Sequence, residues 1–289
     1  MIKKAIILAG GTGSRLRPAT LSVNKHLLPI YDKPLVYYPL SLMMLIGIKN
    51  ILIIINKGEK KLFYNLLGDG SHLGINIKYK EQNKPNGIPE AFIIGKNFIN
   101  GDKVALILGD NIFYGQGLIE ILKKNKKFTK GAKIFTYPVQ NPKDFGVVEI
   151  KKNKISKILE KPRNTKSNLA ITGLYFFDKN VGTIAKQLKP SKRNETEIVD
   201  ILKIYLKKNL VKIEHLGRGS AWLDTGTIKN NLSSSNFVSV VEERQNYKIA
   251  CIEEIAFKNK WINKKELKKI IQNLGKCEYS KYLKNILNN

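Results

Sequence analysis

The sequence contains little cysteine and histidine, and this shortage excludes several classes of protein. Two cysteines and three histidines among 289 residues fit neither a disulfide framework nor a zinc site in number or spacing. Apolar runs are short as well. They fall far below the roughly 20 residues of a membrane-spanning helix, and Ala5–Ala9 is too short for the apolar region of a signal peptide. We therefore expect a cytoplasmic protein with no membrane partner.

Arginine is also scarce, although the chain is strongly basic. The formal net charge is +28, but only six of the 51 basic residues are arginines. Proteins that bind nucleic acid usually rely on arginine for base edges and paired phosphate contacts. The lysines are spread along the whole chain, which predicts a solvated surface whose field attracts small anions. A nucleic-acid-binding protein is the less favoured alternative, and it predicts DNA binding that survives added salt.

The hydrophobic pattern predicts a doubly wound α/β fold. Hydrophobic residues make up 43% of the chain and charged residues 26%, a balance that excludes intrinsic disorder. Short apolar runs predict strands at Lys4–Ala9, Asn50–Ile55, Ile75–Tyr79 and Val104–Leu108. The stretches between them have helical spacing and lie at Leu35–Gly47, Gly58–Leu67 and Ile88–Phe98. Alternation of nearly continuous apolar strands with helices is typical of a parallel sheet covered on both faces.

The second half of the chain has a different pattern. Closely spaced strands are predicted at Lys133–Val139, Gly146–Ile150, Ile155–Glu160, Ile171–Phe177 and Leu210–His215. A helix is predicted over Glu195–Lys207, and the chain is mostly helical from Ile228 onward. We expect a β-rich part that continues the same fold, followed by a helical C-terminal segment.

A glycine-rich segment after the first strand is the first candidate site. Leu8-Ala-Gly-Gly-Thr-Gly-Ser-Arg-Leu-Arg-Pro18 lets backbone N–H groups approach an anion closely. It is neither a Walker A loop nor a dinucleotide loop, because Gly-Lys-Ser/Thr is missing and Arg15-Leu-Arg17 replaces the last glycine. Arg15, with Lys25 ten residues further on, adds positive charge. We predict a phosphate-binding loop rather than an ordinary glycine turn.

Two aspartates each follow an apolar stretch, Asp110 in Leu106–Phe113 and Asp224 in Ser220–Thr227. A carboxylate at the end of a buried strand is costly unless it is paired, and Mg²⁺ takes one or two carboxylates together with phosphate oxygens. The alternative to metal binding is a structural role, in which the Asp110 side chain caps the turn that follows. The two acids are far apart in the sequence, so a shared Mg²⁺ is a hypothesis that depends on the fold.

A third candidate is the pair Glu160-Lys161, which is followed by a proline. The carboxylate can accept hydrogen bonds from sugar hydroxyls, and the ammonium can hold a monophosphate. A solvated surface ion pair is the alternative, because exposed Lys and Glu are commonplace.

In this order, the motifs resemble those of the sugar-nucleotide pyrophosphorylases, and among them the branch of the glucose-1-phosphate thymidylyltransferases. The resemblance is carried by Gly10–Thr20, Lys25–Leu40, Leu108–Gly115, Glu160–Pro162, Ile171–Phe176, Ala221–Thr227 and Val241–Gln245. It implies a Rossmann-like, doubly wound mixed sheet with a β-rich sugar-binding part. It also implies a nucleotidyltransferase domain over 1–240, with a nucleotide-binding part at about 1–125 and a sugar-phosphate part at about 126–227. The segment 241–289 would be helical and packed on that domain.

The resemblance implies an Mg²⁺-dependent reaction between dTTP and glucose 1-phosphate. A phosphate oxygen of the sugar attacks the α-phosphorus, and pyrophosphate leaves in line, giving dTDP-glucose for dTDP-deoxysugar synthesis of the dTDP-rhamnose type. Since the nucleophile is already anionic, the protein must supply positioning and charge rather than a strong base. The family commonly assembles as a homotetramer, a dimer of dimers.

Site roles are carried over residue by residue from the resemblance. The implied catalytic residues are Arg15, Lys25 and Lys161. The implied nucleotide-binding residues are Gly10, Gly13, Ser14, Arg15, Lys25, Gln82, Gly87 and Asp110, with Gln82 and Gly87 at the thymine edge. The sugar phosphate would be bound by Asn111, Gly146, Glu160, Lys161, Ile171 and Arg193. Asp110 and Asp224 would hold Mg²⁺.

The chain departs from the family pattern near the base pocket. Asn86, Pro89 and Glu90 replace Asp, Ala and Gln, and His26 replaces a usual Gln. Thymine and uracil share the N3–H and O4 edge, and their one methyl difference is worth about 1–3 kcal/mol. A related sugar-1-phosphate uridylyltransferase is therefore the alternative enzyme. An inactive relative is disfavoured because the candidate catalytic and metal residues are all present.

Overall fold

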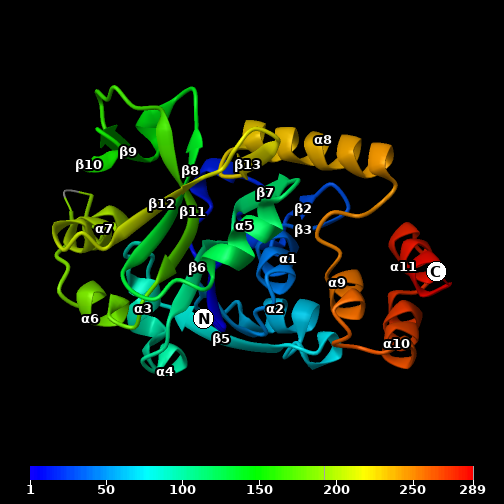
Figure 1. Cartoon of the computed structure of the whole chain (residues 1–289). Coiled ribbons are helices and arrows are strands. Elements are labelled where there is room, and N and C mark those ends of the chain that lie inside the picture. Colours follow the sequence, from blue (N-terminus) through cyan, green and yellow to red (C-terminus); the bar gives the residue numbers. More distant parts are fainter. Residues whose placement is uncertain (192, 289) are drawn as a thin grey trace.

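The protein is described by a computed structural model that covers residues 1–191 and 193–288. A nine-stranded mixed sheet forms its centre, in the order β10-β9-β11-β6-β1-β4-β5, with β8 paired to β11 and β12 paired to β8 (Figure 1). Its strands are β1 (Lys4–Leu8), β4 (Asn50–Asn56), β5 (Asn76–Gln82), β6 (Val104–Leu108), β8 (Ala132–Pro138), β9 (Gly146–Lys151), β10 (Lys154–Glu160), β11 (Leu169–Phe177) and β12 (Val211–His215). Two small antiparallel pairs lie outside it: β2 (Pro29–Ile30) with β3 (Lys33–Pro34), and β7 (Asn111–Gly115) with β13 (Ser220–Asp224).

The parallel half of the sheet is built around β1, β4 and β6, which are buried on both faces. Strand β1 pairs in parallel with β4 and β6, and β4 pairs with β5. Successive side chains point to opposite faces, so Ile7 joins one core cluster and Ile6 another. Both residues are fully buried. The predicted doubly wound α/β fold is confirmed.

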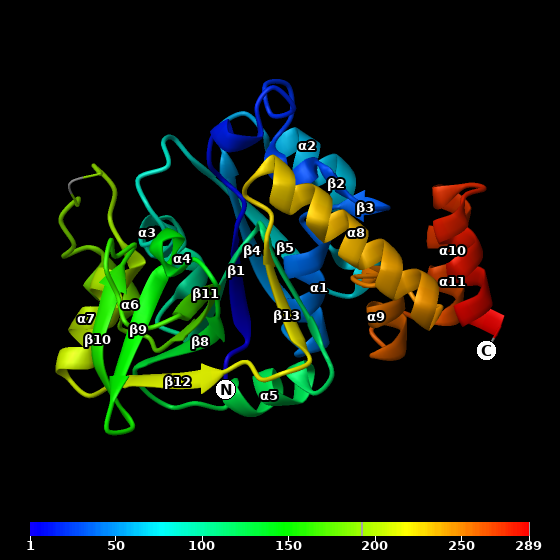
Figure 2. The same ribbon diagram turned by 90° about the horizontal axis from the view of Figure 1, so that it is seen from above.

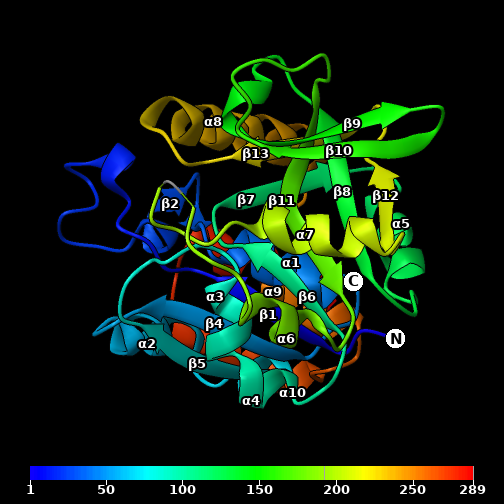
Figure 3. The same ribbon diagram turned by 90° about the vertical axis from the view of Figure 1, so that its left-hand side faces the viewer.

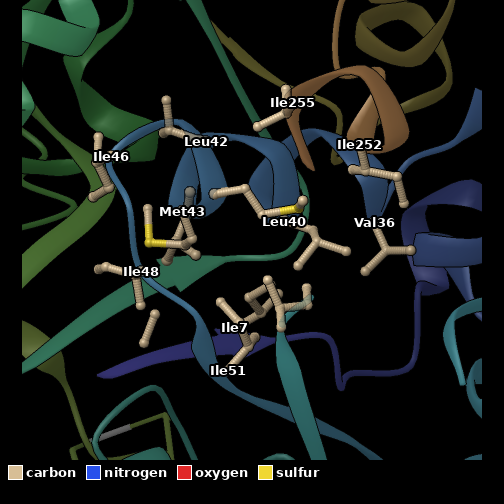
Figure 4. Close-up of a cluster of buried hydrophobic side chains, with 14 of the residues drawn as sticks. Ile7, Val36, Leu40, Leu42, Met43, Ile46, Ile48, Ile51, Ile252 and Ile255 are labelled. Atoms are coloured by element: carbon tan, nitrogen blue, oxygen red, sulfur yellow. The ribbon is translucent and has the colours of Figure 1, made fainter. Parts of the chain in front are cut away.

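Helices cover both faces of the sheet. They are α1 (Tyr37–Leu45), α2 (Lys60–Leu67), α3 (Glu90–Ile94), α4 (Lys96–Ile99), α5 (Leu118–Asn125), α6 (Val181–Ala185), α7 (Ile198–Lys207), α8 (Ile228–Gln245), α9 (Ile252–Lys258), α10 (Lys264–Leu274) and α11 (Glu278–Asn288). Helices α8, α10 and α11 extend beyond the sheet. Figure 3 views the molecule from the side of α6 and α7. Figure 4 shows the opposite core, where Leu40 and Met43 of α1 lie between Ile7 of the sheet and Ile255 of α9. Among the helices described, none is both long and apolar enough to cross a bilayer.

The C-terminal helices lie at the opposite end of the molecule from the β9–β10 hairpin (Figure 2). Two tyrosines of α11 hold it to α9: Tyr279 donates to Glu253 and Tyr282 to Glu254, each at 2.6 Å. Helix α8 is joined to the β2–β3 hairpin through the buried Lys33, whose ammonium lies 2.8 Å from Glu242. The helical segment predicted after Ile228 is thus present and packed on the rest of the chain.

Two of the predicted helices differ from the structure, one in where it begins and one in being broken in two. The helix predicted from Glu195 begins at Ile198, because Glu197 is extended and uses its carboxylate to bind Arg193. The helix predicted over Ile88–Phe98 is two short helices that meet at Gly95. Glycine weakens a helix interior, which explains the break.

Candidate active site

A cavity of about 310 Å³ opens at the carboxyl ends of β1 and β6. In doubly wound sheets this edge is where ligands bind. Its walls include most of the predicted site residues: Gly10, Arg15, Gln82, Gly87, Asp110, Asn111, Gly146, Glu160, Lys161, Ile171, Arg193 and Asp224. Gly13, Ser14 and Lys25 are predicted site residues outside the lining, and Lys25 reaches the cavity wall through an ion pair with Asp110.

The two candidate metal-binding acids lie next to each other. Strand β7 pairs with β13 so that Asp224 lies opposite Asn111, the residue after Asp110. Residues opposite each other in an antiparallel ladder have Cα atoms about 4.5–5.5 Å apart. Thr225 completes the junction by donating from its amide and its hydroxyl to the backbone oxygen of Asp110. The fold therefore brings Asp110 and Asp224 together, which the sequence alone could not establish.

The pKa values of these two carboxyls are shifted in opposite directions. Burial alone would raise the pKa of Asp110, but Lys25, His26 and a 2.9 Å hydrogen bond from Asn111 outweigh it, and the pKa lies well below its ordinary value. Burial and the neighbouring Asp110 raise the pKa of Asp224, although Arg15 and Lys25 oppose this. A cation placed between the two carboxyls would favour the ionised form of Asp224, which its surroundings otherwise disfavour.

Arg15 can lie close to Asp224 because the intervening residue, Gly226, has no side chain. A Cβ atom at Gly226 would lie 2.7 Å from an Arg15 Nη atom and 3.0 Å from Asp224 Oδ1. Gly226 also donates its amide to Asp224 Oδ1 at 2.9 Å. The missing side chain leaves room for the guanidinium beside Asp224.

Asn111 connects the acids to the part of the cavity wall formed by Gly173 and Trp222. Its Oδ1 accepts from the Trp222 indole at 2.6 Å and from the Gly173 amide at 3.1 Å. A Cβ at Gly173 would lie 2.5 Å from that oxygen, so the close approach requires glycine. In this structure the Asn111 carbonyl oxygen is committed to protein donors, and only the amide nitrogen has capacity left for a ligand.

The other side of the cavity carries a charged cluster. Arg193 donates to Glu160 at 3.1 Å and to Glu197 at 2.7 Å. Burial and Glu197 raise the pKa of Glu160, while Arg193 and Lys161 act against them. Lys161 adopts a left-handed backbone, with φ +40, and its amide donates to the Phe145 carbonyl at 3.1 Å. A non-glycine residue in this region costs free energy and is often found at functional sites.

The part of the cavity beside the loop after β5 depends on two glycines. The Gln82 amide packs against Gly10, where a Cβ would lie 2.0 Å from Gln82 Nε2. Gly87 has φ +109, and a Cβ there would lie 2.0 Å from the Thr196 carbonyl oxygen. Thr196 in turn donates its amide to Asn86 at 2.8 Å. The loop after β5 is thereby fastened to the segment before α7, across the cavity.

Sequence reasoning missed several residues that shape the site. Asn24, Asn56 and Glu59 form a hydrogen-bonded group beneath the glycine loop, and Phe145 and Trp222 pack ring to ring on the cavity wall, 5.1 Å apart. A single Asn or Glu carries no motif. The one available signal was the position of Asn56 at the carboxyl end of a buried strand.

A sequence model of the Nucleotidyl transferase family matches residues 4–239, so the fold and the cavity are those of a nucleotidyl transferase. The chain is 49% identical to the glucose-1-phosphate thymidylyltransferase of Neisseria meningitidis (serogroup A, serotype 4A), over 98% of this chain and 99% of the other. It is 46% identical to that of Mycobacterium tuberculosis, with the same coverage. The chain therefore belongs to the family of the glucose-1-phosphate thymidylyltransferases.

A solved structure agrees with this assignment. A protein of Bacillus anthracis, described as a glucose-1-phosphate thymidylyltransferase and crystallised with sucrose, superimposes with a TM-score of 0.75 at 37% identity. The match covers 81% of this chain and 94% of the other.

Proposed function

We propose that this chain transfers a thymidylyl group from dTTP to α-D-glucose 1-phosphate, giving dTDP-glucose and pyrophosphate. The product would enter dTDP-deoxysugar synthesis of the dTDP-rhamnose type. The observation that carries the proposal is a single cavity with the glycine-loop residues and Gln82 on one side and Glu160, Lys161 and Arg193 on the other. Close relatives of the chain bear the name of this enzyme.

The residues of the cavity would act by position and charge. Gly10, Gly13 and Ser14 would present backbone groups to the triphosphate, and Arg15 and Lys25 would stabilise the charge that develops as pyrophosphate leaves. Lys161 would hold the attacking phosphate, while Glu160 would accept hydrogen bonds from the glucose hydroxyls. Gln82 and Gly87 would contact the thymine edge. Asn111, Gly146, Ile171 and Arg193 would surround the sugar phosphate.

We propose Mg²⁺ as the cofactor, held by Asp110 and Asp224. The raised pKa of Asp224 beside a second buried carboxylate supports this, because a hard cation between the two would favour the ionised form of Asp224. The described residues contain no group of three or more His, Cys, Asp or Glu side chains suited to a metal. The ion would therefore take its other ligands from phosphate oxygens and water. When bound, it would neutralise charge on the phosphates.

The division of the chain into parts is also a proposal. The nucleotidyltransferase domain would span 1–240 and the C-terminal helical segment 241–289. Exposed Ile228 and Leu232 are four residues apart on α8, the spacing that aligns side chains on a helix, and Val240 further along the helix is exposed as well. These exposed apolar side chains support a contact between subunits, and we propose a homotetramer, a dimer of dimers, as the assembly. We propose the cytoplasm as the location.

The test is a comparison of substrates. Pyrophosphate release would be measured with dTTP or UTP, each with glucose 1-phosphate or glucosamine 1-phosphate. We expect the highest kcat/KM with dTTP and glucose 1-phosphate. A higher value with UTP would identify a sugar-1-phosphate uridylyltransferase instead, and no release with any pair would overturn the proposal.

A further inference from the structure

The side chain of Asn56, the last residue of β4, makes two hydrogen bonds to the backbone of Gly11 in the glycine loop. Its Oδ1 accepts from the Gly11 amide at 2.8 Å, and its Nδ2 donates to the Gly11 carbonyl at 3.0 Å. A backbone N–H can only donate and a backbone C=O can only accept. The two contacts therefore fix which end of the Asn56 carboxamide is oxygen and which is nitrogen.

The same oxygen also faces Gln82. Parallel pairing of β4 and β5 places Asn56 and Gln82 side by side, and Gln82 Nε2 donates to Asn56 Oδ1 at 3.3 Å. Because that oxygen is an acceptor, the Gln82 carboxamide must turn its nitrogen toward it. Gln82 is only 6% exposed and lines the cavity. Its carbonyl oxygen and second amide hydrogen are left for a ligand.

Glu59 fixes Asn56 by accepting hydrogen bonds from both its side chain and its backbone. Its carboxylate accepts from Asn56 Nδ2 at 3.1 Å and from the Asn56 amide at 3.2 Å. It also accepts from Asn24 Nδ2 at 2.6 Å, and Asn24 donates to the Ala9 carbonyl at 3.0 Å. Asn56 therefore cannot flip without losing bonds to both Gly11 and Glu59.

We infer that Asn56 is a positioning residue that sets how Gln82 reads the base. The inference rests on the proposed function, in which Gln82 contacts thymine. Thymine offers an N3–H donor beside an O4 acceptor, and a carboxamide held in one orientation matches both with its oxygen and nitrogen. Cytosine offers an N3 acceptor beside an N4 amino donor, which needs the flipped carboxamide. The order of hydrogen bonds from Gly11 through Asn56 to Gln82 selects thymine over cytosine.

The test compares two substitutions at the same position. Asn56→Ala removes the acceptor that faces Gln82, whereas Asn56→Asp keeps an oxygen there; both disturb the contact with the Gly11 carbonyl. Asn56→Asp is combined with Glu59→Gln to avoid repulsion between two carboxylates. The measured quantity is the ratio of kcat/KM for dTTP to kcat/KM for dCTP, with glucose 1-phosphate saturating. These nucleotides share the triphosphate and sugar, so damage to the loop alone leaves the ratio unchanged.

We expect Asn56→Ala to lower the ratio by about tenfold, the effect of one lost hydrogen bond. We expect the double variant, Asn56→Asp with Glu59→Gln, to keep the ratio of the wild type even if both rates fall. In a Gln82→Ala background, Asn56→Ala should change the ratio no further, since the two residues act as a unit. Asn24→Ala, which weakens the loop support without contacting Gln82, should also preserve the ratio.

Parallel loss of both rates in Asn56→Ala, with an unchanged ratio, would overturn the inference while leaving the proposed function intact. A wild-type chain that releases no pyrophosphate from dTTP would overturn both. Because the ratio is measured within each variant, partial unfolding cancels, and dissociation constants for the two nucleotides by calorimetry give a second readout of the same selectivity.

Discussion

Thr225 donates two hydrogen bonds to the backbone oxygen of Asp110, from its amide at 3.0 Å and from its hydroxyl at 2.9 Å. Thr225 is fully buried, so this junction is shielded from water. It closes the end of the β7–β13 ladder and holds Asp224, the preceding residue, beside Asp110. Two short strands from distant parts of the chain thus build the acidic side of the cavity.

The first prediction concerns Asp224→Asn. Its neighbour Asp110 and burial disfavour the ionised carboxylate, so the amide should leave the melting temperature unchanged or higher. Its oxygen can still accept from Gly226. Turnover should fall by about a hundredfold or more, the scale seen when charge stabilisation in a site is lost. Thermal unfolding and pyrophosphate release would be measured on the same sample. Retained turnover would contradict the role in metal binding.

A second prediction concerns Gly146→Ala. A Cβ there would lie 3.1 Å from Val199 Cγ2 and 3.6 Å from Glu160 Oε2, and so would narrow the proposed glucose pocket. We expect the KM for glucose 1-phosphate to rise about tenfold, within the range for one added methyl group in a pocket. The KM for dTTP should not change.

Gly217→Ala is the matched control for this substitution. A Cβ at Gly217 meets no atom within 4 Å, so steady-state constants should equal those of the wild type. An equal rise in the KM of both substrates in Gly146→Ala would show a general disturbance of the fold instead of a glucose pocket.

A third prediction concerns His26, which is 1% exposed. Burial, reinforced by Lys25, lowers its pKa from 6.5 to about 3. Between these values the unfolded chain binds a proton that the folded chain does not. The free energy of unfolding should therefore fall as the pH drops through this window, by at most about 1.4 kcal/mol per pH unit from this group.

His26→Gln should remove that contribution, because Gln does not titrate. Urea unfolding of both proteins at pH 7, 6, 5 and 4 would give the difference in slope. The difference should be largest between pH 6 and pH 4 and absent above pH 7. Parallel curves for the two proteins would show that His26 gains its proton equally in the folded and unfolded states.

Much of the fold could be predicted because its central strands, β1, β4 and β6, are buried on both faces and therefore nearly continuous in apolar residues. Strand β6 has the predicted bounds, Val104–Leu108, and β1 and β4 differ by one residue at one end. The small strands β7 and β13 were missed as strands. The sequence pattern of these residues indicates site motifs and turns. Their pairing depends on contacts between distant segments, which local periodicity does not encode.

The candidate site could be predicted where a residue type is out of place for stability. Asp110 at the end of an apolar strand is such a residue, and the cavity wall includes it. The position of Asn56 at the carboxyl end of a strand was too weak a signal to single it out, and Glu59, in the loop that follows, carried none. Their importance arises only from hydrogen bonds across the chain, such as the one between Asn56 and Gly11.

The most direct test of the central claim is the rate of pyrophosphate release from dTTP and glucose 1-phosphate by Asp110→Asn, with Mg²⁺ present and the fold verified by circular dichroism. If the two joined acids serve the transfer, the variant should be folded and at least about a hundredfold slower than the wild type. Turnover at the wild-type rate in a folded Asp110→Asn protein would contradict the claim.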